Sequence, residues 1–412
     1  MQTLLASPLK EAFSLQGKDH QRVCSPMNDL PLYFDYAATT PVDERVIQVM
    51  VECLGASGNF GNPASGSHRY GQQARLAVEQ ARAQVAALVG ADAEQIVWTS
   101  GATESNNLAL KGVAHGRQGG HIVTSQIEHK AVLDTVLQLE QAGVVVTRLA
   151  PDAHGRISPQ TVRNALRDDT FLVSVMLVNN ELGTVNDVAA IGKAVRQHGA
   201  VMHVDAAQGA GKLIIDLQQW PVDLMSFSAH KVYGPKGIGA LYVGERARPL
   251  LQAQIHGGGH EGGLRSGTLA THQIVGMGAA FALAGVLHSE ELLRIGQLRG
   301  RLLEQLSEVP GLVINGGRGP HIEHTLSLTF NGDSPNLERL SEHLAFSSTS
   351  ACNSSSSQPS HVLLALGLTP QAARQTLRLS LGRYTQAQDV DQAVRAIKAS
   401  LQSQPFWAVA GG

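Results

Sequence analysis

The chain has 412 residues, 43% of them hydrophobic, and its 32 basic residues nearly balance 34 acidic ones for a formal net charge of -2. This composition supports a large core and excludes a disordered or fibrous protein, and the length predicts one large domain plus a smaller one. Balanced charge does not favour nucleic acid or an anionic membrane as the main partner, so a small soluble substrate fits better.

In the first two-thirds of the chain, from about residue 69 to residue 244, helical and strand patterns alternate. Gly90, Gly143 and Gly199 stand where helices should end. Continuously apolar strands separated by helices indicate a mostly parallel sheet covered on both faces, with ligands at the carboxyl ends of its strands. The expected helices cover residues 72–90, 129–143 and 187–199, and the expected strands cover residues 96–100, 144–150, 171–178, 201–207 and 222–228.

A different pattern follows residue 285 and predicts a smaller α+β domain. Its expected helices cover residues 289–309 and 389–403, and its expected strands cover residues 312–316, 325–330 and 377–381. The Ser-rich segment "SSTSACNSSSSQPS" favours a mobile loop over about 347–359. The predicted division is a loose extension over 1–28, a small domain from 29–40 and 288–402, a large domain over 41–287, and a tail over 403–412.

Cysteine usage and the N-terminus indicate a cytoplasmic protein. The three cysteines, Cys24, Cys53 and Cys352, form neither a CxxC pair nor an even framework, so we expect a reducing compartment without disulfides. No apolar run approaches the roughly 20 residues of a transmembrane helix, and no apolar signal segment follows basic residues. Residues 1–28 are too acidic for a transit peptide.

Polar clusters stand at the ends of several predicted elements. In "TSGATESNN" a glycine separates a strand from a helix that opens with Thr103 and Glu104, which favours an anion but also fits an ordinary capped turn. In "HVDAAQ", Asp205 ends a buried strand and suits a cation such as a pyridinium nitrogen, although a salt bridge or helix cap explains it equally well.

Lys231, His129 and Cys352 are the candidates for chemistry. Lys231 follows an apolar strand in "SFSAHKVYGPKG", where a buried amine is costly unless neutralised, for instance by a Schiff base with an aldehyde. His129 in "SQIEHKAV" could stack on a ring or move a proton, or be structural. Cys352 lies in the Ser-rich segment, where core packing explains a thiol poorly and an accidental linker thiol is the alternative.

Other motif interpretations fail on spacing. "QGAGKL" lacks the first glycine and the hydroxyl residue of a phosphate-binding P-loop, and "GPKGIGA" does not match a dinucleotide fingerprint. Glycines between His256 and His260 disfavour a helix that would carry both as metal ligands, so no metal site is expected there. That segment is expected to be a flexible loop.

Taken together, the motifs resemble the cysteine desulfurases of the IscS and NifS group, in the class-V aminotransferase family of fold-type-I pyridoxal-phosphate enzymes. The resemblance runs from about Leu32 to Trp407. It implies a large domain with a mostly parallel seven-stranded sheet between helices, plus the smaller α+β domain. The motifs are "YFDYAATTPVD", "GNPASGSHRYG", "SGATESNNLALKG", "EHKAVLDT", "VNNELGTV", "HVDAAQ", "DLMSFSAHKVYGPKGIGALYV", "HGGGHEGGLRSGT", "SSTSAC" and "LRLSLGRYT".

The same resemblance implies a cofactor, pyridoxal 5'-phosphate, and a homodimer. Lys231 would bind the cofactor aldehyde covalently, Asp205 would pair with the ring nitrogen and His129 would stack on the ring. Gln208 and Asn180 would lie near the ring hydroxyl. The phosphate would be held by Ala102, Thr103, Ser228 and His230, and by Thr268 of the other subunit.

The implied reaction takes sulfur from L-cysteine and releases L-alanine. Lys231 would act as base, His129 would move a proton, and Arg378 would bind the substrate carboxylate beside Asn180, with Arg383 as the second candidate. Cys352 would accept the sulfur as a persulfide, and it is also a candidate ligand of a transferred iron–sulfur cluster. No resident metal is expected.

The acceptor of the sulfur stays open at this stage. An iron–sulfur scaffold protein and a relay for tRNA or DNA thiolation are the candidates, and the long Ser-rich loop resembles the scaffold-serving members. Three alternatives are a selenocysteine lyase, another class-V aminotransferase and a non-catalytic sulfur-relay scaffold. An aminotransferase has no use for Cys352, and the presence of Lys231, Asp205 and His129 argues against a non-catalytic protein.

Overall fold

A computed structural model describes residues 30–331, 334–348 and 358–401, and the described residues from Leu32 onward belong to one compact unit. The predictions for the N-terminal extension, the C-terminal tail and Cys352 therefore concern residues outside the described part. Within the described part, no helix has the length and apolar character needed to cross a membrane.

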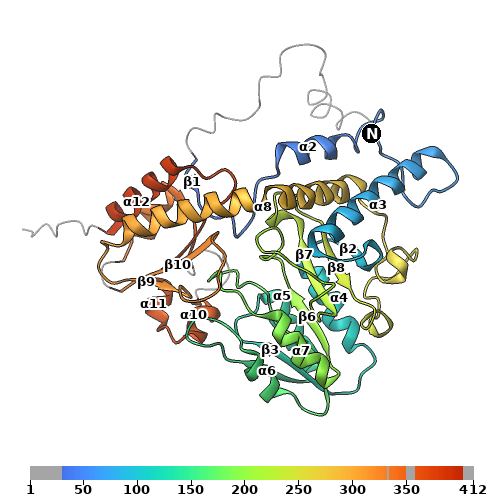
Figure 1. Cartoon of the computed structure of the whole chain (residues 1–412), viewed down its shortest axis with the longest axis horizontal. Coiled ribbons are helices and arrows are strands. Elements are labelled where there is room, and N and C mark those ends of the chain that lie inside the picture. The colour runs from blue at the N-terminus through green and yellow to red at the C-terminus, as the bar shows by residue number, and fades with distance from the viewer. Residues whose placement is uncertain (1–29, 332–333, 349–357, 402–412) are drawn as a thin grey trace, which may run out of the picture. The chain divides into compact units, whose positions relative to one another are not determined.

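The centre of the unit is a seven-stranded sheet with the strand order β2-β8-β7-β6-β5-β3-β4 (Figure 1). Strand β8 pairs antiparallel with both of its neighbours and runs against the other six strands, so the expected mostly parallel sheet is confirmed. The strands are β2 (Ile96–Thr99), β3 (His121–Ser125), β4 (Val145–Leu149), β5 (Thr170–Ser174), β6 (Val201–Asp205), β7 (Leu224–Ser228) and β8 (Gly239–Val243).

Helices cover both faces of this sheet because successive strand residues point to opposite sides. Val97 packs in the core formed with α4 and α5, whereas its neighbour Trp98 packs in the core formed with α3, α7 and α8. The helices of this part are α2 (Glu44–Val51), α3 (Arg69–Val89), α4 (Ala102–Ala114), α5 (Lys130–Gln141), α6 (Pro159–Ala165) and α7 (Val188–His198).

A four-stranded antiparallel sheet with the order β12-β13-β10-β9 lies beside helices of the C-terminal part, as expected for a smaller α+β layer. Its apolar face packs with α8 and α12 around Leu302, Leu328 and Val394. The remaining strands are β1 (Leu32–Tyr33), β9 (Leu312–Asn315), β10 (Thr325–Phe330), β11 (Leu344–Ala345), β12 (Ser347–Ser348) and β13 (Thr376–Ser380). The remaining α-helices are α8 (Thr271–Leu306), α9 (Leu337–Ser341), α10 (His361–Ala365), α11 (Pro370–Arg374) and α12 (Ala387–Leu401).

Helix α8 is longer than the sequence analysis predicts. The expected start was residue 289, but the helix begins at Thr271 and continues without a break to Leu306. Its first half buries Ile274, Met277 and Phe281 in the core shared with α3, and its second half packs against α12 (Figure 1). The expected division between domains at residues 287 and 288 therefore falls inside one helix, and it stays a prediction.

Other element ends follow local chemistry. Gly90 and Gly199 adopt left-handed conformations that end α3 and α7, as expected. The strand expected over residues 171–178 ends at Ser174. Strand β8 was not predicted; its Gly239 is needed because a Cβ there would lie 2.6 Å from Gly101 Cα. This close approach lets β8 pass the turn that opens α4.

Candidate active site

A pocket of about 880 Å³ opens at the carboxyl ends of the parallel strands. Strands β6 and β7 end there at Asp205 and Ser228, and α4 and α5 begin there. This is the edge of the sheet at which the sequence pattern placed a ligand. The predicted site residues that line it are Ala102, Thr103, His129, Asn180, Asp205, Gln208, Ser228, His230, Lys231 and Arg378.

The N-terminus of α4 forms one end of the pocket. Gly101 precedes the helix with φ of 153°, a conformation that favours glycine. The first N–H groups of a helix lack intrahelical acceptors and attract anions, so the turn at Ala102 and Thr103 suits a phosphate. Glu104 does not oppose an anion as a free charge, because its carboxylate accepts from Ser100 N at 2.7 Å and pairs with Arg265 at 2.9 Å.

Asp205 presents a buried carboxylate at the end of β6. Its Oδ1 accepts from Ala207 N at 3.0 Å, and its Oδ2 accepts from Asn106 Nδ2 at 2.7 Å. Because these two donors fix both oxygens, the carboxylate is oriented before any ligand binds. Asn106 lies one helical turn into α4, so that helix supports both the anion end of the pocket and the acid.

Lys231 lies in a short 3-10 turn that follows β7. Its Nζ donates to Ala37 O and to Ala38 O, each at 2.6 Å. Burial and the nearby positive charge of Arg378 lower the pKa of Lys231 to about 8. More of this amine is therefore neutral, and nucleophilic, near physiological pH than of an exposed lysine.

His129 is the N-cap residue of α5 and lines the pocket. Its Nδ1 accepts from Ala131 N at 3.1 Å, which leaves the ring fixed by the helix start. Desolvation by the surrounding protein lowers the pKa of His129, so the neutral imidazole is favoured. A neutral ring with a fixed orientation can stack on an aromatic ligand or accept a proton.

Arg378 projects from β13 into the pocket and is held on two sides. Its Nη1 donates to Asn180 O at 3.1 Å, and its Nη2 donates to Asp35 Oδ1 at 2.8 Å and to Ser347 Oγ. Within the described residues, Arg378 Nε is buried without a hydrogen-bond partner. A buried donor without a partner in a pocket suits a carboxylate ligand.

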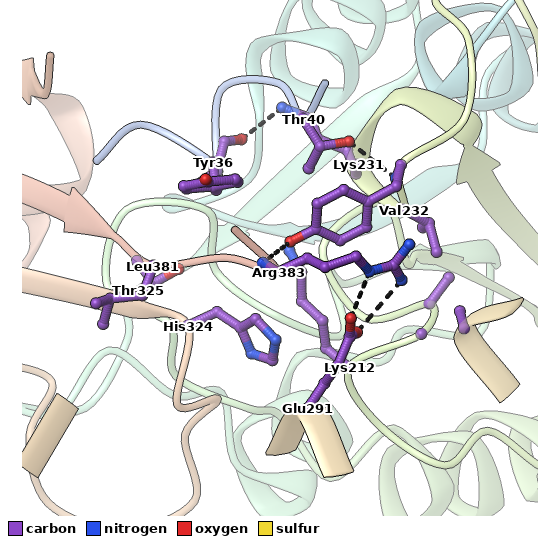
Figure 2. A pocket seen from close by; sticks show the side chains of 15 residues that line it. Tyr36, Thr40, Lys212, Lys231, Val232, Glu291, His324, Thr325, Leu381 and Arg383 are labelled. Atoms are coloured by element: carbon purple, nitrogen blue, oxygen red, sulfur yellow. Dashed lines mark hydrogen bonds and ion pairs between the residues drawn. The ribbon is translucent and has the colours of Figure 1, made fainter. Parts of the chain in front are cut away.

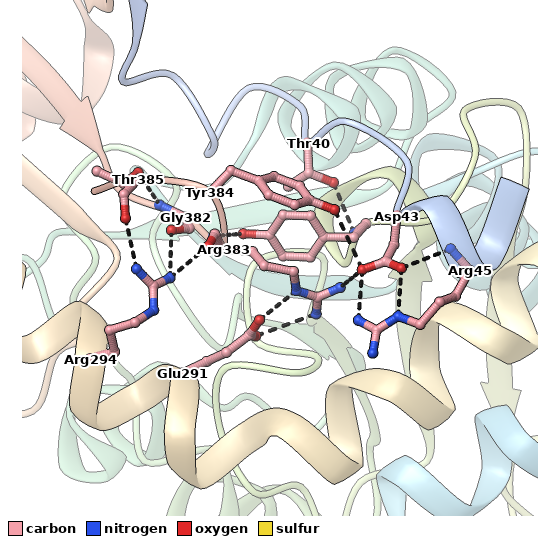
Figure 3. A network of polar contacts seen from close by, with 10 residues as sticks. Thr40, Asp43, Arg45, Glu291, Arg294, Gly382, Arg383, Tyr384 and Thr385 are labelled. Carbon is pink, nitrogen blue, oxygen red and sulfur yellow. Dashed lines mark hydrogen bonds and ion pairs between the residues drawn. The ribbon is translucent and has the colours of Figure 1, made fainter. Parts of the chain in front are cut away.

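Arg383, the second candidate for a carboxylate contact, is engaged elsewhere. Its guanidinium pairs with Glu291 of α8 and with Asp43 at 2.7 Å, and lies 4.0 Å over the ring of Tyr233 (Figure 3). Asp43 also caps α2 and binds Arg45. Arg383 does not line the large pocket, so its geometry favours a role in joining α2 and α8 to the turn after β13.

Besides Arg383, Thr268 is the described predicted residue that does not line the pocket. Thr268 is exposed and lies in the segment before α8. Cys352 lies outside the described residues, but Ser348 and Gln358, which flank residues 349–357, both line the pocket. Both described ends of this segment are therefore at the site.

The structure adds residues that the sequence analysis did not single out. Asn106, Asp35 and Glu128 contact or adjoin the predicted site residues. Asn106 and Glu128 stand in the quoted motifs "SGATESNNLALKG" and "EHKAVLDT", so helical spacing from Thr103 and the position next to His129 were the available signals. Asp35 is brought to Arg378 by tertiary structure alone, and no local pattern announces that contact.

Among the described residues, no three His, Cys, Asp or Glu side chains gather as potential ligands of a metal ion. His256 and His260 lie in a largely irregular segment before α8, and a short 3-10 turn follows at Glu261–Gly263. The expectation that the glycines disfavour a regular helix between these histidines agrees with that irregular backbone.

Comparisons with known proteins define the class. The family model described as aminotransferase class-V matches residues 32–393. A cysteine desulfurase IscS of Pseudomonas entomophila is 55% identical over 385 residues, covering 92% of this chain and 95% of the relative. A solved NifS-like protein has a TM-score of 0.82 at 34% identity, covering 90% of this chain and 99% of its own. The structure titled "SspA in complex with cysteine" has a TM-score of 0.77 at 43% identity, covering 85% and 98%.

These matches span nearly the whole described chain, and their sequence identity is higher than a shared fold alone requires. The chain belongs to the class-V aminotransferase family and, within it, to the cysteine desulfurases. It is a fold-type-I enzyme that depends on pyridoxal 5'-phosphate.

The pocket fits that cofactor by the chemistry of its side chains. It combines a primary amine on Lys231, a buried carboxylate on Asp205 and an open helix N-terminus at Ala102 within one volume of about 880 Å³. An aldehyde, a ring nitrogen that can carry a proton and a phosphate need those three groups respectively.

Proposed function

We propose that this cysteine desulfurase moves sulfur from L-cysteine to Cys352 and that the pocket residues named above carry the reaction. The observation that carries the proposal is the joint lining of one pocket by Lys231, Asp205, His129 and Arg378, with both ends of the Cys352 segment beside it. Another class-V aminotransferase is not favoured, because the relatives with 55% identity are cysteine desulfurases.

The cofactor, when bound, supplies an electron sink that lets the substrate Cα lose its proton. Lys231 would hold the cofactor aldehyde and then serve as the base, for which a pKa of about 8 is suitable. Asp205 would hold the protonated ring nitrogen, and Asn106 keeps its carboxylate oriented for that contact. The N-terminal turn of α4, with Ser228 and His230, would hold the phosphate.

Substrate orientation would come from Arg378. Its unpaired Nε supplies a donor for the cysteine carboxylate, while Asp35 and Asn180 O hold the guanidinium in place. A fixed carboxylate would restrict how the rest of the cysteine lies in the pocket that Lys231 lines, as reaction at its Cα and its thiol requires.

Cys352 would receive the sulfur as a thiolate nucleophile. The S–S bond forms as the carbon–sulfur bond of the substrate breaks, so that cysteine and the enzyme thiol become alanine and an enzyme persulfide. Cys352 follows Ser348 by four residues, and four residues of fully extended chain reach at most about 14 Å. His129 would carry a proton between the thiol that loses it and the carbon that becomes the methyl group of alanine.

The decisive test compares the wild type with Cys352→Ala. We expect both to show a yellow visible band that changes on adding L-cysteine, but only the wild type to release alanine over many turnovers and sulfide with a reductant. Cys53→Ala is the matched control, because Cys53 is a buried thiol at the end of α2. A colourless wild type, or alanine release unaffected by the loss of Cys352, overturns the proposal.

The assembly and the acceptor extend this proposal. A homodimer is supported by Thr268, which is exposed in the isolated chain and, by resemblance, would complete the phosphate site of the other subunit. Light scattering at several protein concentrations tests the dimer, and a Thr268→Ala variant should then hold the cofactor more weakly. A monomer that holds the cofactor fully would contradict a shared site.

The sulfur would pass from Cys352 to an acceptor protein, either an iron–sulfur scaffold or a thiolation relay, in the cytoplasm. Incubation with radiolabelled cysteine and each purified acceptor distinguishes them, since only the true acceptor should gain label from wild type and none from Cys352→Ala. Label on neither acceptor would exclude both.

A further inference from the structure

A second lysine lies behind the cofactor pocket and takes no part in the reaction described above. Lys212 is buried, with 9% of its surface exposed, and lines a small space of about 20 Å³ together with Lys231, His324 and Glu291 (Figure 2). Burying a lysine costs free energy, so a buried lysine next to the cofactor pocket calls for a functional explanation.

Hydrogen bonds connect Lys212 to Lys231 through one side chain and one carbonyl. Lys212 Nζ donates to Gln208 Oε1 at 2.7 Å, and Gln208 Nε2 donates to Ala37 O at 2.8 Å. Ala37 O also accepts from Lys231 Nζ at 2.6 Å. The two lysines thus act on opposite ends of the same short chain of polar groups.

The amide oxygen of Gln208 accepts hydrogen bonds and its amide nitrogen donates them. The neighbouring groups therefore determine which of the two amide orientations is stable. The ammonium form of Lys212 has only donors, and Ala37 O is only an acceptor. The reversed amide would set a donor against Lys212 and an acceptor against Ala37 O, losing both bonds. Lys212 therefore fixes which end of Gln208 faces the pocket.

The backbone holds Lys212 in this position. Gln208 and Lys212 are four residues apart in a hydrogen-bonded turn, in which Ala210 N donates to Ala206 O and Lys212 N donates to Gly209 O. Gly211 has φ of +73° and lies so close to Val232 and Ala284 that a Cβ would approach them to 2.8 and 3.0 Å. The turn is therefore packed tightly against the segment that follows Lys231.

We propose that Lys212 is a positioning residue for the cofactor site: by holding Gln208 Oε1, it directs Gln208 Nε2 toward Ala37 O and the pocket. This rests on the proposed function, in which Gln208 lies near the ring hydroxyl of the cofactor. Burial and the charge of Lys231 lower the pKa of Lys212 to about 7. The neutral amine keeps N–H donors for Gln208 Oε1 but also has a lone pair, so the ammonium form selects this amide orientation more strictly.

The test measures equilibrium binding of pyridoxal 5'-phosphate to the apo-protein in a double-mutant cycle. Lys212→Met removes the donor while keeping similar length and should weaken binding by about tenfold, the effect of one hydrogen bond. In a Gln208→Ala background, adding Lys212→Met should weaken binding by less than about twofold, because its route to the cofactor is already lost. An equal loss in both backgrounds, or no loss in the first, overturns the proposal.

A spectroscopic readout separates positioning from a general structural role. Loss of an aligned donor near the ring hydroxyl makes that oxygen more basic, so the midpoint of the pH-dependent visible band should rise in Lys212→Met. It should not rise further when Lys212→Met is added to Gln208→Ala, and a rise there contradicts the proposal. Lys212→Leu, which also lacks the donor, is measured the same way if Lys212→Met does not fold.

Measurements on the wild type separate a failure of the proposed function from a failure of the positioning role. If the wild-type apo-protein does not bind pyridoxal 5'-phosphate, or the bound form does not release alanine from cysteine, the proposed function is wrong whatever Lys212 does. If the wild type does both and the cycle shows no coupling between Lys212 and Gln208, only the positioning role is wrong.

Discussion

Arg378 and Asp35, 343 positions apart in the chain, form an ion pair of 2.8 Å at the pocket. The pair joins β13 to the segment that follows β1 and neutralises part of the guanidinium charge before any substrate binds. Arg378 Nη1 is also used, by Asn180 O, while Nε is buried and unpaired within the described residues. The arginine is therefore a rigid donor rather than a free charge.

This rigidity predicts that Arg378→Lys is not a conservative change. Lysine keeps the charge but loses the planar fork, so it cannot hold Asp35 and a substrate carboxylate together. We expect KM for L-cysteine to rise by about tenfold or more, as for loss of one charge-assisted hydrogen bond. Alanine release over a range of cysteine concentrations measures it. Arg374→Lys in α11, whose arginine is not a pocket residue, is the matched control, and an unchanged KM in Arg378→Lys would refute the role.

Asp205→Asn should remove turnover while keeping one of the two hydrogen bonds that the carboxylate accepts. The amide can still accept from Ala207 N, but it carries no charge to hold a protonated ring nitrogen. We expect kcat to fall by roughly 100-fold or more, which is typical for loss of a preorganised electrostatic contact. Asp187→Asn, which keeps a capping side chain at the start of α7, is the control. A kcat within about threefold of wild type would argue against the assigned role of Asp205.

Much of this site was predictable because its residues stand at the ends of apolar strands. Asp205 and Ser228 end strands with a largely apolar pattern, Lys231 follows one, and parallel strands bring their carboxyl ends to one edge. The apolar pattern of the strands and the polar residues at their ends were enough to predict that these residues lie together. The roles assigned to them came from resemblance, since periodicity says nothing about which ligand binds.

Other features required the tertiary structure. The contact between Arg378 and Asp35 joins distant segments and has no local signature. The early start of α8 was missed because its first half is apolar on several sides and is stabilised as a helix by packing against α3. Strand β8 was missed because its pattern of small and apolar residues resembles a loop until it pairs with β2 and β7.

The pKa of about 8 for Lys231 predicts how the apo-protein reacts with amine reagents. Only the neutral amine is nucleophilic, so about a tenth of Lys231 should react at pH 7 and about nine-tenths at pH 9. Acetylation by a neutral ester, followed by mass spectrometry of the Lys231 peptide, should therefore show a midpoint near pH 8. Prior addition of pyridoxal 5'-phosphate should block the labelling. A midpoint at or above pH 10 would show that burial does not depress this pKa.

The burial of Glu128 predicts that the free energy of unfolding depends on pH, whether or not the enzyme is active. It is fully buried next to His129, its Oε1 accepts from Ser125 Oγ and from Met176 N, and its Oε2 has no partner within the described residues. Burial raises the pKa of Glu128 from 4.5 to about 8. The folded state therefore binds more protons than the unfolded state between those values.

The sign of the effect follows from that difference in bound protons. The contribution of Glu128 to stability is fully present below about pH 4.5 and is lost as the pH rises through about 8. Glu128→Gln cannot ionise, so its Tm relative to wild type should rise by roughly 2–5 °C between pH 6 and pH 8.5. Differential scanning calorimetry measures this, with the exposed Glu245→Gln as control. A difference in Tm that stays constant over that range would mean that Glu128 is ionised in the folded protein, with its unpaired Oε2 satisfied by water.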